Sequence, residues 1–308
     1  MDSNTWLAEA DACHDDDPAR AAALLRRIDG AALAAEQWPL FAFLLNHVLG
    51  EKLGRWAEAS ARLSTLLAHT GAAPLALWRH AAVAARLAGD EAAAAAHTQA
   101  LAAATGASAA QAGELVALAA TVLQAGTLPA APAATLALAA LGPLAAAHWQ
   151  AASALDAAVA AQCNNLASGF VDRPITDLAD PALRSALTLA AECASLFWQR
   201  AGTWVNHERA FYLSALVSSA LGDAGAALGH ANAGLALLDA HDQTREHSVD
   251  RAFLTLEASF ALERLARAGE AQASRAQADA LAAAFGDAGL DAWFADRVAR
   301  NAALRLAG

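Results

Sequence analysis

Apolar residues recur at spacings of three and four along most of the chain, which places them on one face of an α-helix. The clearest stretch, Thr203 to Asp239, predicts two helices, and Gly234 in the second allows close backbone approach. Their stripes are Phe211, Ala215, Ser218 and Leu221, then Ala227, Ala231, Leu235 and Leu238. Between them, Gly222 suits a left-handed helix end and Asp223 suits the cap of the next helix. So short a turn makes the helices pack antiparallel, and their outer apolar faces need another pair to cover them.

The same alternation of apolar stripes with Gly, Pro or acidic turn residues predicts helices along the rest of the chain. By residue number, the expected helices are 3–13, 18–28, 39–52, 56–69, 74–88, 91–105, 108–125, 132–141, 148–168, 181–201, 244–268, 270–285 and 290–306. Ser3 or Asn4 is expected to cap the first helix, and Gly269-Glu270 to form the last tight turn. The helix 290–306 is expected to cover the final exposed face. Its arginines (Arg297, Arg300 and Arg305) suit its C-terminal end and its water-facing side.

Glycines in the first half of the chain mark a repeat. From Gly54 the next turn glycine follows after 35 residues and the one after that follows after 37. These steps are close to the period of about 34 residues of helix–turn–helix arrays. From Gly169 to Gly222 the step grows to 53 residues. The segment 169–181 is therefore interpreted as an irregular insertion that interrupts or bends the stack.

Several of these units resemble the tetratricopeptide repeat (TPR). Its pattern has a bulky residue early in the first helix, a small residue a turn later, a Gly-acidic turn, and alanine in the second helix. Matching sets are Trp78, Ala82 and Gly89-Asp90; Phe211, Ala215, Gly222-Asp223 and Ala227; and Phe43, Gly54, Trp56 and Ala59. His47 departs from the pattern, because it stands where a small residue is expected. The likeness covers roughly two thirds of the chain.

The resemblance implies an all-α fold, a right-handed α-α superhelix that forms one TPR-like solenoid of antiparallel helix pairs over residues 1–308. N-terminal repeats would occupy 1–142. An atypical long-helix unit with the loop 169–181 would occupy 143–202, and C-terminal repeats with a capping helix would occupy 203–308.

Composition supports helices and disfavours several functions. The chain is 57% hydrophobic and 17% charged, so disorder is not expected. Much of the apolar content is alanine, which favours helices over strands. The formal net charge of −11 repels phosphate backbones, so no nucleic-acid partner is expected.

The expected location is the cytoplasm. The three cysteines, Cys13, Cys163 and Cys193, are far apart and odd in number, which indicates reduced thiols. No charged-then-apolar leader begins at Met1. The uncharged segment 115–155 is long enough to span a bilayer, but Gly and Pro residues divide it into shorter pieces, so no membrane role is expected.

The sequence contains no recognisable catalytic motif, so we predict no enzyme activity, no cofactor and no metal site. The segment 239–250 gathers Asp, Glu and His residues, but their spacing matches no zinc motif, and a solvated polar loop is favoured. The acidic run Asp15 to Asp17 could bind a cation, although a helix-capping loop is the favoured interpretation. Cys163 and Cys193 are interpreted as small core residues.

The predicted function is that of a non-catalytic scaffold or adaptor, which binds a protein, peptide or partner helix in a concave groove formed by the first helix of each pair. The groove candidates are Arg79, His80, Arg86, Asn164, Asn165, Trp204, Asn206, His207, Arg209 and Tyr212. Amides there could bind a peptide backbone and arginines a carboxylate. Because Lys52 is the only lysine, the lysine–asparagine clamp that some family members use to hold a carboxylate is not visible.

Four alternatives stay open. The groove residues could pair only with neighbouring helices. The chain could be a ligand-responsive sensor or regulatory domain that binds a small molecule near the insertion 169–181 and Trp198/Trp204. An enzyme that uses the loop from His241 to His247 is the least favoured alternative. The chain could also form a homodimer.

Overall fold

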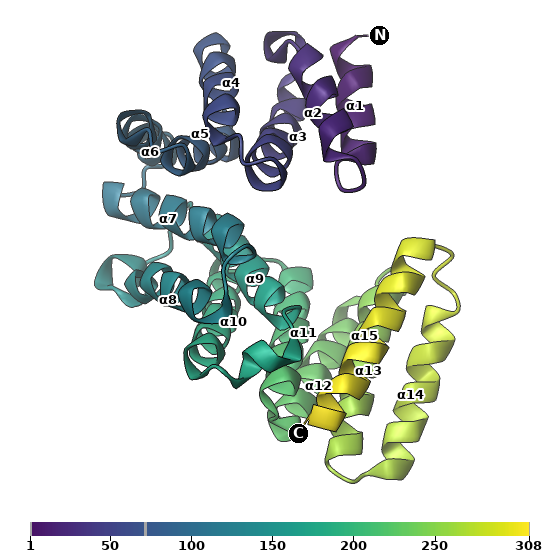
Figure 1. Cartoon of the computed structure of the whole chain (residues 1–308). Helices are drawn as coiled ribbons and strands as arrows, with labels where there is room; N and C mark the ends of the chain where they lie inside the picture. Colours follow the sequence, from purple (N-terminus) through teal and green to yellow (C-terminus); the bar gives the residue numbers. More distant parts are fainter. Residues whose placement is uncertain (1, 71–72, 308) are drawn as a thin grey trace. The chain divides into compact units, whose positions relative to one another are not determined.

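A computed structural model describes residues 2–70 and 73–307, and within these ranges the regular structure is entirely helical (Figure 1). The all-α prediction is therefore confirmed. The first α-helices are α1 Ser3–Cys13, α2 Pro18–Arg27, α3 Trp38–Leu44, α4 Trp56–His69, α5 Leu75–Leu87, α6 Glu91–Thr105 and α7 Ala109–Ala125. The remaining ones are α8 Ala130–Leu141, α9 Asp156–Val171, α10 Pro181–Ala201, α11 Trp204–Leu221, α12 Ala224–His241, α13 Ser248–Arg264, α14 Ala268–Ala282 and α15 Ala288–Ala307.

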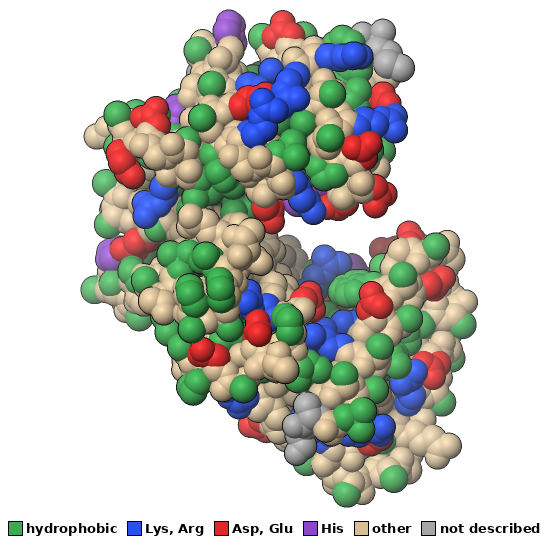
Figure 2. All heavy atoms as spheres, viewed as in Figure 1, with side chains coloured by type: hydrophobic (Ala, Val, Ile, Leu, Met, Phe, Trp, Pro, Cys, Tyr) green, Lys and Arg blue, Asp and Glu red, His purple; other side chains and the backbone are tan. Residues whose placement is uncertain are grey.

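The chain forms two compact units, which are described separately. Unit 1 comprises Met1–Gln124 and Ala147–Leu155, and unit 2 comprises Ala125–Ala146 and Asp156–Gly308. Figure 2 shows acidic and basic side chains interspersed with small hydrophobic areas on the visible face of each unit.

Unit 1 has one leucine-rich core. In it α1 packs on α2, α4 on α5, and α5 on α6. The core includes Phe41, Leu49 and Leu63, which are almost fully buried. Trp149, from the segment Ala147–Leu155, is also buried, and its indole Nε1 donates a hydrogen bond to Glu114 of α7.

Unit 2 is built from helices that pack beside their neighbours in the chain. The pairs α9 with α10, α11 with α12, and α13 with α14 lie side by side, and α15 packs against α11 and α13 (Figure 1). The turn between α11 and α12 is as predicted, because Gly222 is left-handed with φ of +90° and Asp223 caps α12 by accepting from Ala226 N at 2.9 Å. Phe294 of α15 is buried against Phe253 of α13, with ring centroids 5.5 Å apart.

The predicted long helix 148–168 is wrong at both ends. The observed helix α9 begins at Asp156 and continues through Gly169 to Val171. Its start is displaced because the preceding segment brings Trp149 into the core of unit 1, and only a short 3-10 segment (Ala147–Trp149) and turns precede the helix. Its end is displaced because a single glycine in an apolar stripe costs only about 1 kcal/mol, which tertiary packing outweighs.

Other boundaries also differ from the predictions. Asp2, not Ser3 or Asn4, caps α1 by accepting from Thr5 N at 2.9 Å. Gly269 lies within α14, and the left-handed residue before that helix is Ala266, with φ of +59°. The predicted helix 244–268 begins only at Ser248, because an aspartate organises the preceding loop, as described below.

The predicted helix 39–52 changes type along its length. It is α-helical over Trp38–Leu44 and then forms a π-helix over Leu45–Lys52. Gly50 in this segment allows the close approach of Trp56, since a Cβ on Gly50 would lie 2.2 Å from the ring of Trp56. π-helical turns are uncommon and often occur at functional sites.

The uncharged segment 115–155 is divided between α7, α8, short 3-10 segments and turns. Among the described residues, no helix combines the length and apolar character needed to cross a membrane.

Candidate binding pocket

Unit 2 contains a pocket of about 570 Å³, here called the unit 2 pocket. Its lining residues come almost entirely from alternate helices. They are Ala161, Asn164, Asn165, Ser168 and Val171 of α9, Asp172 after it, Trp198 of α10, Asn206, Arg209, Tyr212, Leu213 and Leu216 of α11, Val249, Asp250 and Phe253 of α13, and Leu290, Trp293 and Arg297 of α15. Five of the ten groove candidates are among them: Asn164, Asn165, Asn206, Arg209 and Tyr212.

Amide side chains supply much of the neutral polar surface of the pocket. Asn164 and Asn165 are consecutive on α9, and within the described ranges no hydrogen bond uses either side chain. Asn206 is partly committed, since its Oδ1 accepts from the backbone N–H of Thr203 at 2.9 Å and caps α11. The two amides of α9 therefore retain both donor and acceptor capacity.

Aromatic rings form the apolar part of the pocket. Phe253 is buried and lies 4.2 Å from Trp293, measured between ring centroids, and 6.0 Å from Tyr212. Trp293 is 46% exposed although it borders this cluster. An exposed indole on an aromatic base is a surface on which apolar or planar groups can pack.

Charged residues of the pocket are arranged as ion pairs. Arg209 Nη2 lies 3.3 Å from Asp250 Oδ2, and Arg297 Nη1 lies 3.5 Å from Asp172 Oδ1. Arg297 Nη2 also lies 3.7 Å from the fully buried Glu257. Opposite charges thus largely balance one another around the pocket.

Three buried donor atoms of the pocket lack a hydrogen-bond acceptor among the described residues. These are the hydroxyl of Tyr212 and both Nε and Nη2 of Arg297, whose side chain is only 5% exposed. Burial raises the pKa of Tyr212, so the phenol keeps its proton at neutral pH. An unmatched buried donor costs free energy, and a bound acceptor oxygen would recover it.

Two further groove candidates on α11 contact other helices instead of lining the pocket. His207 Nε2 lies 3.0 Å from the carbonyl oxygen of Trp198, which ties the start of α11 to the end of α10. Trp204 stacks on His241 at 5.3 Å and meets His247 edge-on at 4.9 Å between ring centroids.

The remaining groove candidates, Arg79, His80 and Arg86, lie on α5 in unit 1. Asn46 Nδ2 donates to the carbonyl oxygen of His80 at 3.0 Å and lies 3.2 Å from its ring Nδ1. Burial and the neighbouring Arg79 lower the pKa of His80 to about 3, so its ring is neutral. Arg86 is exposed near the end of the helix.

The polar segment 239–250 comprises the end of α12, the loop 242–247 and the first turn of α13. Asp242 is buried and accepts from the backbone N–H groups of Glu246 at 2.9 Å and His247 at 3.2 Å. Asp239 pairs with Arg251 at 2.7 Å. These contacts agree with the interpretation of a polar loop.

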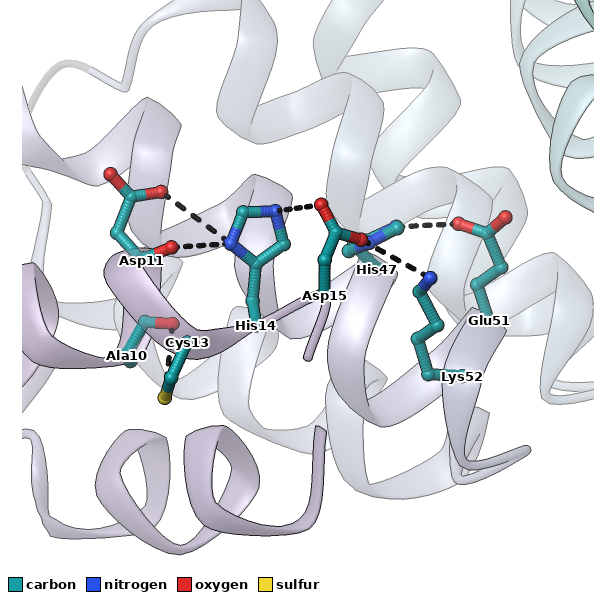
Figure 3. Close-up of polar contacts among 8 residues, drawn as sticks. All are labelled: Ala10, Asp11, Cys13, His14, Asp15, His47, Glu51 and Lys52. Atoms are coloured by element: carbon teal, nitrogen blue, oxygen red, sulfur yellow. Dashed lines mark hydrogen bonds and ion pairs between the residues drawn. The ribbon is translucent and has the colours of Figure 1, made fainter. Parts of the chain in front are cut away.

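One group of side chains in the described ranges has the proximity needed to hold a metal ion, and the sequence prediction of no metal site did not include it. It consists of His14, Asp15 and His47 in unit 1, whose ligand atoms all lie within 4.8 Å of one another (Figure 3). The acidic run at Asp15 was one part of the signal, and the unusual His47 in its repeat was the other. Nothing in the sequence indicated that the two segments meet.

Sequence reasoning also missed part of the pocket. Arg297 was expected on the water-facing side of the last helix, but it is buried because α15 turns that face toward α11 and α13. Arg300 is also part-buried and donates to the carbonyl oxygen of Arg173 at 2.8 Å. Phe253 and Trp293 carried no local signal beyond their apolar character.

No protein-family model matches the chain, and no curated protein matches it significantly.

Proposed function

We propose that the protein is a TPR-like helical-repeat interaction protein, and that the unit 2 pocket binds an extended peptide segment of a protein partner. The observation that carries this proposal is the alternation of the lining. Helices α9, α11, α13 and α15 supply nearly all lining residues, whereas within the described ranges α12 and α14 supply none. In stacked helical pairs of a superhelix, the first helices share one concave face, which is the usual binding face.

The chemistry of the pocket supports a peptide as the bound segment. Asn164 and Asn165 offer donors and acceptors that match the N–H and C=O groups of an extended backbone. Phe253 and Trp293 offer an apolar surface for a peptide side chain. The hydroxyl of Tyr212 and Nε of Arg297 are donors for a carbonyl or carboxylate oxygen.

The charged side chains of the unit 2 pocket also support a protein partner, because they are balanced and form no patch of one sign among the described residues. The carboxylates of Asp172 and Asp250 are each matched by an arginine. The proposed partner is therefore a protein rather than a nucleic acid or a membrane surface, and the three free thiols fit a reducing cytoplasm.

The proposal can be tested with a display library of random peptides, selected on the purified full chain. Selected peptides would be labelled, and their affinity measured by fluorescence polarisation. The double substitution Asn164→Ala/Asn165→Ala is expected to weaken binding about 5- to 30-fold, which corresponds to losing one or two hydrogen bonds. Arg267→Ala is the matched control, because Arg267 is exposed and pairs with Glu270, outside the pocket.

Equal affinity of the wild-type chain and the double asparagine variant would contradict the proposal. A second outcome would also contradict it. The selected peptides would compete for one site, yet a chain carrying both Trp293→Ala and Tyr212→Phe would bind them as tightly as the wild type.

A second candidate function is binding of a small molecule by a sensor or regulatory domain. Val171 and Asp172, at the start of the irregular segment, line the pocket, and a volume of about 570 Å³ lies in the range of small-molecule sites. Native mass spectrometry of the purified protein distinguishes the two. A small molecule that copurifies with the folded chain, and that is released when the chain unfolds, would favour this second function.

A further inference from the structure

We propose that His14, Asp15 and His47 form a binding site for a divalent transition-metal ion such as Zn²⁺. The site lies within unit 1, and it is independent of the unit 2 pocket. A failure of either proposal therefore leaves the other standing.

Two histidines from separate elements face the same carboxylate. His14 Nε2 lies 3.3 Å from Asp15 Oδ2, and His47 Nε2 lies 3.3 Å from Asp15 Oδ1 (Figure 3). Bonds of about 2.0–2.2 Å around a tetrahedral ion place neighbouring ligand atoms about 3.4 Å apart. The spacing between each imidazole nitrogen and the carboxylate thus suits a shared ion.

The other nitrogen of each imidazole is already held by an acceptor. His14 Nδ1 is within hydrogen-bonding distance of the carbonyl oxygen of Asp11, in the last turn of α1. His47 Nδ1 lies 2.7 Å from Glu51 Oε2, one turn along the π-helix. A carbonyl and a carboxylate can only accept, so both rings carry their proton on Nδ1. Ligand histidines in metalloproteins are oriented in this way, by a hydrogen bond from the nitrogen that does not bind the metal.

When the proton is on Nδ1, Nε2 of each ring is unprotonated, and its lone pair faces the carboxylate of Asp15. Three acceptors that face one another repel unless a cation lies among them, either protons on both rings or a metal ion. Carboxylates lie on both sides of the His47 ring, with Glu51 at Nδ1 and Asp15 at Nε2, so negative charge gathers at the site. Lys52 Nζ, which lies 3.2 Å from Asp15 Oδ1, neutralises part of this negative charge.

The local structure positions the site and leaves it accessible. His14 is the C-cap of α1 and His47 lies in the π-helix Leu45–Lys52. Phe43 stacks on the ring of His47 at 5.3 Å between centroids, while the Asp15 side chain is 67% exposed and offers a path for an ion. Nitrogen ligands favour Zn²⁺ and related transition metals over Mg²⁺ or Ca²⁺, which prefer oxygen.

The test is calorimetric titration of Zn²⁺ into the full chain, prepared without a histidine tag and cleared of metal with a chelator. We expect one ion per chain, with affinity weakened at least about tenfold by His14→Gln, His47→Gln or Asp15→Asn. His69→Gln is the matched control, because His69 is an exposed histidine at the end of α4 in the same unit. Far-UV circular dichroism establishes that each variant remains helical.

Co²⁺ provides a second readout, since an imidazole-bound tetrahedral ion gives strong visible absorption that hydrated Co²⁺ lacks. The absence of saturable one-to-one Zn²⁺ binding to the wild type would overturn the proposal. Equal affinity of the wild type and the His14→Gln/His47→Gln double variant would also overturn it.

Discussion

Gly234 of α12 lies so close to Leu254 of α13 that a Cβ on Gly234 would be 2.8 Å from Leu254 Cδ2. Leu254 is fully buried and has little room to move. Gly234→Val is therefore expected to lower the free energy of unfolding by roughly 1–3 kcal/mol, through overpacking. Gly229→Ala is the matched control in the same helix, where the added methyl meets open space, and it should raise stability by about 0.5–1 kcal/mol. Urea unfolding measures both, and equal effects would contradict the close contact.

Substitutions between glycine and alanine at the helix ends Gly222 and Ala266 are expected to change the free energy of unfolding in opposite directions. Both residues are left-handed, with φ of +90° and +59°. Alanine in this region carries a steric cost of about 1–2 kcal/mol that glycine does not. We expect Gly222→Ala to lower the unfolding free energy by about 1 kcal/mol, and Ala266→Gly to raise it by a few tenths to about 1 kcal/mol. A loss of stability in Ala266→Gly would show that its methyl group contributes packing.

The buried carboxyl of Glu208 is expected to make stability depend on pH. Both of its oxygens lack a hydrogen-bond partner among the described residues, and burial, with Asp250 nearby, raises its pKa to about 8. The folded state then holds a proton that the unfolded state releases above about pH 4.5, so this group costs stability progressively as pH rises from about 4.5 to 8. Glu208→Gln should therefore stabilise the chain at pH 8, by a few kcal/mol, and much less at pH 5.

The measurement is thermal or urea unfolding of wild type and variant across that pH range. Glu192→Gln is the control, because Glu192 is exposed on α10. A stability difference for Glu208→Gln that does not change with pH would contradict the assignment.

The three thiols are expected to differ in reactivity. Cys163 of α9 and Cys193 of α10 are buried, and the interaction with the Cys193 thiol, together with burial, raises the pKa of Cys163. Cys13 is partly exposed at the end of α1. With a thiol reagent such as DTNB, Cys13 should react first, and the other two only when the chain unfolds. Reaction of all three thiols at one rate in the folded protein would disagree with the packing of α9 on α10.

Local signals predicted most helix ends. Asp17, Asp90, Asp180 and Asp223 each cap a helix through their side chains. The left-handed end at Gly222 also needed only the residues of its own turn. Prediction failed at Ala266, because the nearby Gly269 offered a better local signal but tertiary packing continued α14 through it.

The candidate sites were less predictable than the helices. Asn164 and Tyr212 were selected as groove residues, and both line the unit 2 pocket. Arg297 was expected to face water, and only the packing of α15 on α11 and α13 reveals that it faces the pocket. The meeting of His14 with His47 was equally hidden, since the two are far apart in the chain and share no spacing rule.

The sequence by itself determined that this protein is helical and where most helices begin and end, because capping and apolar periodicity act over a few residues. Only the tertiary structure decided which helix faces meet, and so which side chains share the pocket or the histidine cluster. Those contacts depend on the packing of helices that are distant in sequence, which no short-range pattern records.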